Sequence, residues 1–238
     1  MDRVVTAMQD LVTANRILAR EDVVDAYGHV SIRHPKHPDR YLMSCSRSPA
    51  LVTLDDIMEF SLDGEVLDGS GKSPYAERFI HGAIFEARPD VLSVVHNHSH
   101  SIIPFGVTGM KLRPLVHVTA IIGDDVPIWD IQDKFGDTNL LVVNMEQGRD
   151  LAACLGNRRV ALMRGHGCAV AGATLQESVM ASIYLQVAAT LQMQAMQMGE
   201  IKFLTPGEIE RCQEIFISDL SVDRAWQYFR TRALGPSF

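Results

Sequence analysis

The sequence predicts an α/β fold in which helices cover a central mixed or antiparallel sheet. Short β-branched runs occur along the chain between stretches with helical spacing of apolar residues. A strong turn signal, Asp63-Gly64, predicts a hairpin over residues 59–67. Neither a G-x-G-x-x-G nor a P-loop motif is present, which argues against a nucleotide-binding fold. The 238 residues suit one domain, 1–238, because single α/β domains run to about 200–250 residues.

The first half of the chain begins with an expected helix over residues 3–20, where apolar side chains recur at helical spacing. Short strands are expected at 29–33 and 40–44, before the hairpin. A helix is expected over 74–87, because Ser73 is a suitable N-cap and Pro74 a suitable first-turn residue.

The second half begins with the run Val91 to His98, which is typical of a buried strand. The pattern then predicts a helix over 145–155 capped by Asn144, a strand from 159, a strand over 168–171, and a long helix over 175–199. Thr205 and Glu208 form a capping box that starts another helix, and the last helix is expected over 221–232.

Composition excludes several classes of function. The chain is 47% hydrophobic and 21% charged, which is typical of a globular protein, and its net charge of −7 argues against nucleic acid as a partner. We expect no membrane contact and a cytoplasmic location, because no apolar run of about 18 residues and no signal peptide are found. The widely separated cysteines predict buried, reduced thiols (Cys45, Cys154, Cys168 and Cys212).

Three histidines predict a metal site. His96 and His98 are two residues apart at the end of an apolar run, and residues i and i+2 of a strand point to the same side. His166 follows another apolar run and lies between two glycines, where the backbone can turn freely. Three neutral imidazoles with open positions indicate a catalytic divalent metal site rather than a structural one. The competing interpretation is chance, since nine histidines give some close spacings.

Glu77 is a candidate acid/base residue about twenty residues before the histidine pair. In the expected helix, Glu77 and His81 are four residues apart and lie on one face. A carboxylate next to the metal could move a proton. The alternative is a solvated glutamate near a helix N-terminus, where acidic residues are favoured anyway. Spacing alone favours that alternative.

Four motifs together resemble the class II aldolase and adducin head-domain family over residues 5–200. They are Ser73 to His81, Val94-Val95-His96-Asn97-His98, Gly165-His166-Gly167 and Gly28-His29-Val30-Ser31. The resemblance implies an α/β/α sandwich with a largely antiparallel sheet. It implies one divalent metal, such as Mn²⁺ or Zn²⁺, on His96, His98 and His166, with Glu77 as acid/base. It also implies a homotetramer with active sites at subunit interfaces, to which a C-terminal tyrosine such as Tyr228 could contribute.

The motifs differ from the sugar-phosphate pattern of the family around the expected anion site. His29 replaces an asparagine, and Ser46 and Arg47 lie where a Ser-Gly loop is expected. Arg47 could hold a carboxylate bidentately, although a surface ion pair is an equal alternative. Tyr75 and His29 offer flat surfaces to an aromatic ring. These departures resemble the decarboxylase branch, which acts on hydroxylated aromatic or pyridine dicarboxylates, as in vitamin B6 degradation.

We therefore expect a carbon–carbon lyase that decarboxylates such an acid through a metal-stabilised, enolate-like intermediate. His29, Ser46, Arg47 and Tyr75 are its predicted substrate-binding residues. The alternatives are an aldolase or epimerase acting on a sugar phosphate or hydroxy-keto acid, a metal-dependent dehydratase, and a non-catalytic interaction module like adducin. The full histidine set argues against the last of these.

Overall fold

A computed structural model describes residues 2–235, in which seven strands form one sheet in the order β3-β2-β1-β4-β7-β6-β5. Every neighbouring pair is antiparallel except β5 with β6, so the predicted largely antiparallel sheet is confirmed. The strands are β1 (His29–Arg33), β2 (Arg40–Ser44), β3 (Ile57–Ser61), β4 (Ser93–Asn97), β5 (Ile128–Trp129), β6 (Val160–Met163) and β7 (Gly167–Gly172).

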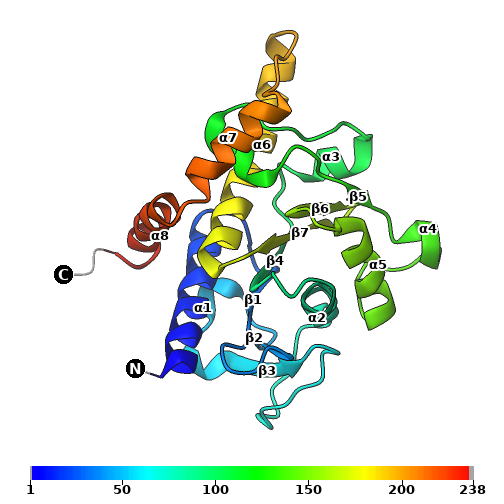
Figure 1. The fold of residues 1–238 in the computed structure, drawn as a ribbon. Helices are drawn as coiled ribbons and strands as arrows, with labels where there is room; N and C mark the ends of the chain where they lie inside the picture. The colour runs from blue at the N-terminus through cyan, green and yellow to red at the C-terminus, as the bar shows by residue number, and fades with distance from the viewer. Residues whose placement is uncertain (1, 236–238) are drawn as a thin grey trace.

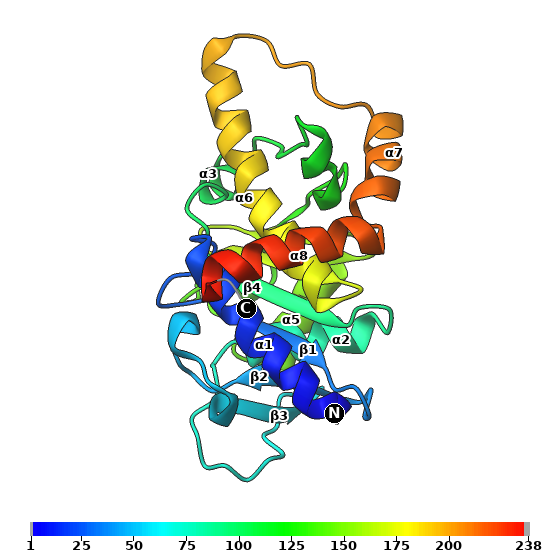
Figure 2. The same cartoon turned by 90° about the vertical axis from the view of Figure 1, so that its left-hand side faces the viewer.

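Helices cover both faces of this sheet, as Figure 1 shows, so the expected α/β/α sandwich is confirmed. One face carries α2 and α5, and the other carries α1, α6 and α8. In Figure 2, α6 extends beyond the sheet before the chain returns to α7. The helices are α1 (Arg3–Arg20), α2 (Arg78–Ala87), α3 (Ile103–Thr108), α4 (Gln132–Phe135), α5 (Met145–Leu155), α6 (Leu175–Met198), α7 (Pro206–Phe216) and α8 (Asp219–Leu234), with the 3₁₀ turns η1 (Pro49–Leu51), η2 (Leu54–Asp56) and η3 (His117–Ile122).

The central strand β4 shows how the core positions the site. All five of its residues are buried, because both faces of the strand are covered. Val95 packs into the cluster beneath α1 and α6, whereas Val94 packs into the cluster beneath α2 and α5. Since side chains alternate along a strand, His96 lies on the same face as Val94, toward α2.

The expected start of α2 is wrong. The helix begins at Arg78, with Glu77 at the N-cap position, and residues 73–75 belong to neither a helix nor a strand. The reason is that this segment contacts the loop after β2: the Ser46 backbone N–H donates to the Ser73 carbonyl, 2.8 Å away. The Tyr75 hydroxyl donates to the Arg47 carbonyl. Ser73 therefore caps no helix, and Glu77 is the N-cap residue of α2.

Other expectations hold with smaller differences. The turn at Gly64 has a φ of 80°, but the return strand contributes only one bridge, Phe60 with Val66, and β3 begins at Ile57. His98 follows β4 rather than lying in it. The cysteines are free thiols, of which Cys168 is fully buried and the other three are partly buried. The short elements α3, α4 and β5 were not expected.

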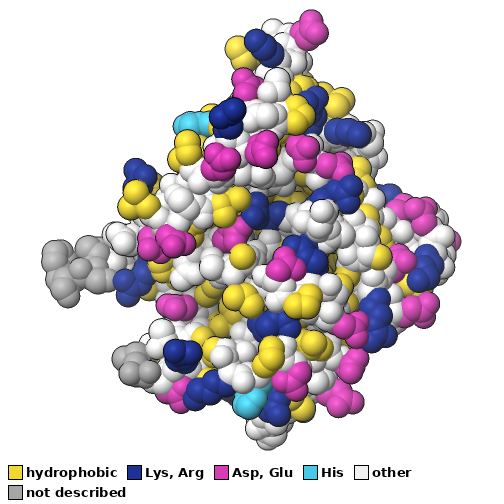
Figure 3. All heavy atoms as spheres, viewed as in Figure 1, with side chains coloured by type: hydrophobic (Ala, Val, Ile, Leu, Met, Phe, Trp, Pro, Cys, Tyr) yellow, Lys and Arg dark blue, Asp and Glu magenta, His cyan; other side chains and the backbone are white. Residues whose placement is uncertain are grey.

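On the face seen in Figure 3, acidic and basic side chains are interspersed. Within residues 2–235, none of the helices combines the length and the apolar character needed to cross a bilayer.

Candidate metal centre

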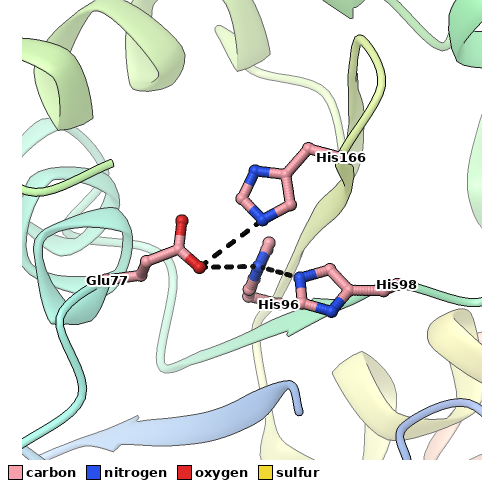
Figure 4. Close-up of side chains that lie close together, drawn as sticks. All are labelled: Glu77, His96, His98 and His166. Carbon is pink, nitrogen blue, oxygen red and sulfur yellow. Dashed lines mark hydrogen bonds and ion pairs between the residues drawn. The ribbon is translucent and has the colours of Figure 1, made fainter. Parts of the chain in front are cut away.

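Four predicted residues meet at one edge of the sheet, as Figure 4 shows. Glu77 comes from the turn before α2, His96 and His98 from the end of β4, and His166 from the turn between β6 and β7. One ligand atom from each of these residues lies within 4.8 Å of all the others. The structure therefore brings together side chains that are up to 89 positions apart in the sequence, from Glu77 to His166.

His96 is completely buried, and its ring is held in one orientation. Its Nδ1 lies 3.0 Å from the Cys168 carbonyl oxygen. Because a carbonyl can only accept, Nδ1 carries the proton, and the lone pair of the neutral ring is on Nε2. That Nε2 lies 2.9 Å from Nε2 of His98. A backbone carbonyl that orients a histidine in this way is typical of metal ligands.

His166 completes the group from the turn between β6 and β7. Among residues 2–235, neither of its ring nitrogens has a hydrogen-bond partner, although both are enclosed. Its two flanking glycines serve different purposes. Gly165 has a φ of 65°, a left-handed conformation that favours glycine. A Cβ on Gly167 would lie 2.1 Å from the Asn97 carbonyl oxygen, so only glycine lets β7 approach β4 this closely.

The two carboxylate oxygens of Glu77 have different neighbours. Oε1 accepts a 3.0 Å hydrogen bond from the backbone N–H of Val142. Oε2 lies 3.5 Å from Nε2 of both His96 and His166, too far for a good hydrogen bond. Burial alone would raise the pKa of Glu77, but His96 and His166 outweigh that effect and lower it. Glu77 is therefore a carboxylate that faces the histidine nitrogens.

These residues fit a divalent cation. Burial, together with His96, lowers the pKa of His98 to about 3, so its imidazole is neutral. Lone pairs on His96 and His98 that converge at 2.9 Å repel each other unless a cation or proton lies between them. The enclosed ring nitrogens of His166, which have no hydrogen-bond partner among the described residues, are explained in the same way. Three imidazole nitrogens and one carboxylate oxygen are suitable ligands for Zn²⁺ or Mn²⁺.

His29 lies beside this centre and contacts a residue without a predicted role. In the register of β1 and β4, His29 pairs with His96, and their ring centroids are 5.0 Å apart. Its Nδ1 lies 2.6 Å from Nε2 of His81, whose Nδ1 lies 2.6 Å from Oγ of Ser31. The sequence alone did not reveal the roles of His81 and Ser31, because their contact depends on the packing of α2 on β1.

These imidazoles are neutral for a common reason. Burial, followed by the nearby His81 and His96, lowers the pKa of His29 well below its usual value. Burial and His96 lower the pKa of His81 to about 3.

The remaining predicted residues are Tyr75, which precedes α2, and Ser46 and Arg47, which lie in the loop after β2. The ring of Tyr75 lies 4.6 Å from that of His29, whereas Ser46 is exposed. Nη1 of Arg47 donates to both oxygens of Asp56, at 3.0 and 3.2 Å, and 44% of the Arg47 side chain is exposed. Burial would raise the pKa of Asp56, but hydrogen bonds from Thr53 and Arg47 lower it to about 2. Arg47 is therefore an ion-pair partner whose other nitrogens, Nε and Nη2, donate to no described residue.

Two further features complete the surroundings. A pocket of about 710 Å³ opens beside His98, between the end of α1 and α6. Tyr228 lies on α8 with 57% of its surface exposed, and its ring contacts Phe229 and Arg232 of its own helix. Its contribution to a neighbouring site stays a prediction.

Comparisons with known proteins found a family match and several similar proteins. A family model described as the class II aldolase and adducin N-terminal domain matches residues 9–193. The decarboxylase tropJ of Talaromyces stipitatus is 33% identical over 92% of this chain and 91% of its own. A 3,4-dihydroxyphthalate decarboxylase of Terrabacter sp. is 28% identical over 82% of this chain and 83% of its own.

Among solved structures, an aldolase II superfamily protein from Pseudomonas syringae matches the fold with a TM-score of 0.81. It is 21% identical and covers 99% of this chain and 96% of its own. The prediction of a carbon–carbon lyase is confirmed by the decarboxylase relatives and the family match.

Proposed function

The chain belongs to the class II aldolase and adducin family, and we propose that within it the protein is a metal-dependent decarboxylase of a hydroxylated aromatic or pyridine dicarboxylate. The observation that carries the proposal is the convergence of Glu77, His96, His98 and His166 at one edge of the sheet. The two decarboxylases to which the chain is similar support the reaction type.

His96, His98 and His166 would hold the cation, and Oε2 of Glu77 faces the nitrogens of His96 and His166. A divalent cation supplies fixed positive charge that stabilises negative charge developing on a substrate oxygen. We propose Mn²⁺ or Zn²⁺, because both accept imidazole ligands.

Glu77 moves the proton in this proposal. As a carboxylate, its Oε2 accepts the proton of the substrate hydroxyl, while Oε1 stays on the Val142 N–H. Glu77 then returns this proton to the ring carbon that carries the carboxylate, so that its own carboxylate is restored. Loss of CO₂ next places the electron pair of the broken carbon–carbon bond in the ring, with the negative charge on the substrate oxygen, so that atoms and charge balance.

The border residues hold the ring and its second carboxylate. Tyr75 and His29, 4.6 Å apart, offer flat surfaces to the ring. Nε and Nη2 of Arg47 remain for a carboxylate while Nη1 stays on Asp56, and exposed Ser46 can donate to the same group. The family's homotetramer, with the site at a subunit interface, is part of the proposal.

A screen for CO₂ release tests this function. The purified protein is loaded with Mn²⁺ or with Zn²⁺ and offered hydroxylated benzene and pyridine dicarboxylates, together with sugar phosphates. We expect CO₂ only from the ring acids and none from protein stripped by a chelator. Cleavage of a sugar phosphate without CO₂ release from any ring acid would replace the proposal by an aldolase. Failure to bind metal after reconstitution would favour a non-catalytic module.

A further inference from the structure

Ser31, His81 and His29 form a buried hydrogen-bonded chain beside the metal centre. The two contacts, Ser31 Oγ with His81 Nδ1 and His81 Nε2 with His29 Nδ1, are both 2.6 Å. The three side chains are at most 3% exposed, so water does not replace either contact. A neutral His81 ring carries one proton, so it donates one of these hydrogen bonds and accepts the other. Both bonds are therefore donated in one direction, either from Ser31 toward His29 or from His29 toward Ser31.

The direction is decided at Ser31. Within residues 2–235, its hydroxyl contacts no hydrogen-bond partner other than His81. If His81 donated to Ser31, the hydroxyl proton would be enclosed without an acceptor, which is the unfavourable outcome for a buried polar group. A charged His81 would also have to donate from Nδ1, and it would leave the hydroxyl proton in the same unfavourable state. Ser31 is therefore the donor, and Nδ1 of His81 is the acceptor.

The tautomers of both rings follow. Because Nδ1 of His81 accepts, its proton is on Nε2, from which it is donated to Nδ1 of His29. Nδ1 of His29 then has no proton, and the single ring proton is on Nε2. That Nε2 bonds to none of the described residues, and it is not among the fully enclosed atoms without a partner. It is a free N–H in a ring that contacts His96 and Tyr75.

We infer that Ser31 and His81 are positioning residues that keep His29 as a neutral Nε2–H donor, and that this donor binds a carboxylate oxygen of the substrate. The acceptor named here rests on the proposed function, but the direction of the chain does not. The chain is not a proton wire, because it ends at a buried hydroxyl. A neutral donor beside the cation suits an anionic oxygen and adds no second positive charge that would repel the cation.

Nuclear magnetic resonance of ¹⁵N-histidine-labelled protein loaded with Zn²⁺ tests the tautomer directly. The patterns of ring ¹H–¹⁵N couplings distinguish a proton on Nε2 from one on Nδ1, and comparison with His29→Asn identifies the His29 signals. We expect the Nε2–H form of His29 in the wild type. We expect both forms in Ser31→Ala, and the wild-type form again in Ser31→Thr. Ser182→Ala removes another buried serine hydroxyl, which donates to the Ser178 carbonyl within α6, and should change nothing at His29.

Steady-state kinetics test the consequence for binding. Ser31→Ala should raise KM for the dicarboxylate about twofold, because about half of the His29 rings would then lack the Nε2 proton, with little change in kcat and a full complement of Zn²⁺. Ser31→Thr should restore KM.

A proton on Nδ1 of His29 in the wild type, or a tautomer unchanged in Ser31→Ala, overturns the inference even if CO₂ release is normal. The Nε2–H form with its loss in Ser31→Ala supports the positioning role even in a protein that releases no CO₂. The two failures are therefore distinguishable.

Discussion

Two groups of histidines at the same edge of the sheet differ in what their ring nitrogens contact. In the metal group (His96, His98 and His166), nitrogens converge without donors between them. In the donor pair (His29 and His81), donors and acceptors alternate down to Ser31. The rings of the two groups are neighbours, at 5.0 Å between His29 and His96. We infer that hydrogen-bond partners, rather than burial or residue type, determine whether a buried histidine in this protein suits a cation or a substrate.

The largest effect should come from Glu77, the carboxylate that faces the metal group. Glu77→Gln keeps the size of the side chain and an oxygen for the Val142 N–H but removes the group that carries the proton. We expect kcat to fall about 10³-fold while metal content stays near one per subunit. Stopped assays of CO₂ release and elemental analysis measure both. The exposed Glu146 provides a control, because Glu146→Gln should leave both values unchanged. Near-normal CO₂ release by Glu77→Gln would remove the acid/base role.

Removal of one histidine from the metal group should lower the affinity for the metal, whereas removal of one from the donor pair should not. His166→Asn removes a ligand, and we expect metal affinity to fall at least about 100-fold, measured by competition with a chelator. His100→Asn is the matched control, because His100 is an exposed histidine two residues after His98. If His166→Asn bound metal as tightly as the wild type, the convergence of the three histidines would have another explanation.

The donor pair should affect substrate binding rather than metal binding. His29→Phe keeps a flat ring but removes the N–H, and we expect KM for the dicarboxylate to rise about tenfold. His29→Asn, which retains an amide donor, should have a smaller effect. Titration of metal into each variant checks that affinity is unchanged. A loss of metal from His29→Phe equal to that of His166→Asn would show that the two groups act as one.

The smallest effect is expected at the ion pair that borders the site. Asp56 has a folded-state pKa of about 2, below its usual value of 3.8. A lowered carboxyl pKa adds stability above pH 4, and this contribution is lost as the pH falls toward 2. Because Arg47 is partly exposed and the pair is screened, we expect a loss of at most about 1 kcal/mol of unfolding free energy between pH 6 and pH 3.

Urea unfolding of the wild type and Asp56→Asn at both pH values measures this contribution. The difference in stability between the two proteins should shrink at pH 3. A difference that stays constant would mean that the Asp56 carboxylate does not contribute through its charge.

Local patterns were sufficient for most of the fold and for the metal group. Helical spacing and capping residues predicted α1, α5, α6 and α7, because those signals lie within each segment. The three histidines were recognisable because each follows an apolar strand. The start of α2 was not predictable in this way. Contacts of residues 73–75 with the loop after β2 outweigh the local preference of Ser73-Pro74 for a helix start.

The donor pair shows what local patterns cannot provide. His29 and His81 are 52 positions apart in the sequence. His81 contacts His29 and Ser31 only because α2 packs on the face of β1 that carries these two residues. The same limit applies to Arg47, whose partner Asp56 is at the other end of the η1–η2 loop. The sequence left two equal interpretations of Arg47, namely binding of a carboxylate or a surface ion pair. In the fold, Nη1 of Arg47 already donates to Asp56.

The antiparallel register of β1 and β4 has a consequence for how this site can be redesigned. Position 29 lies directly across from His96, so under the proposed function a change of side chain there would alter what the substrate contacts without replacing a proposed metal ligand. A slip of one residue in this pairing would instead turn every side chain of β1 to the opposite face. We therefore expect substitution at this single strand position to vary substrate preference, whereas a change of register would remove His29 and Ser31 from the face that carries His96.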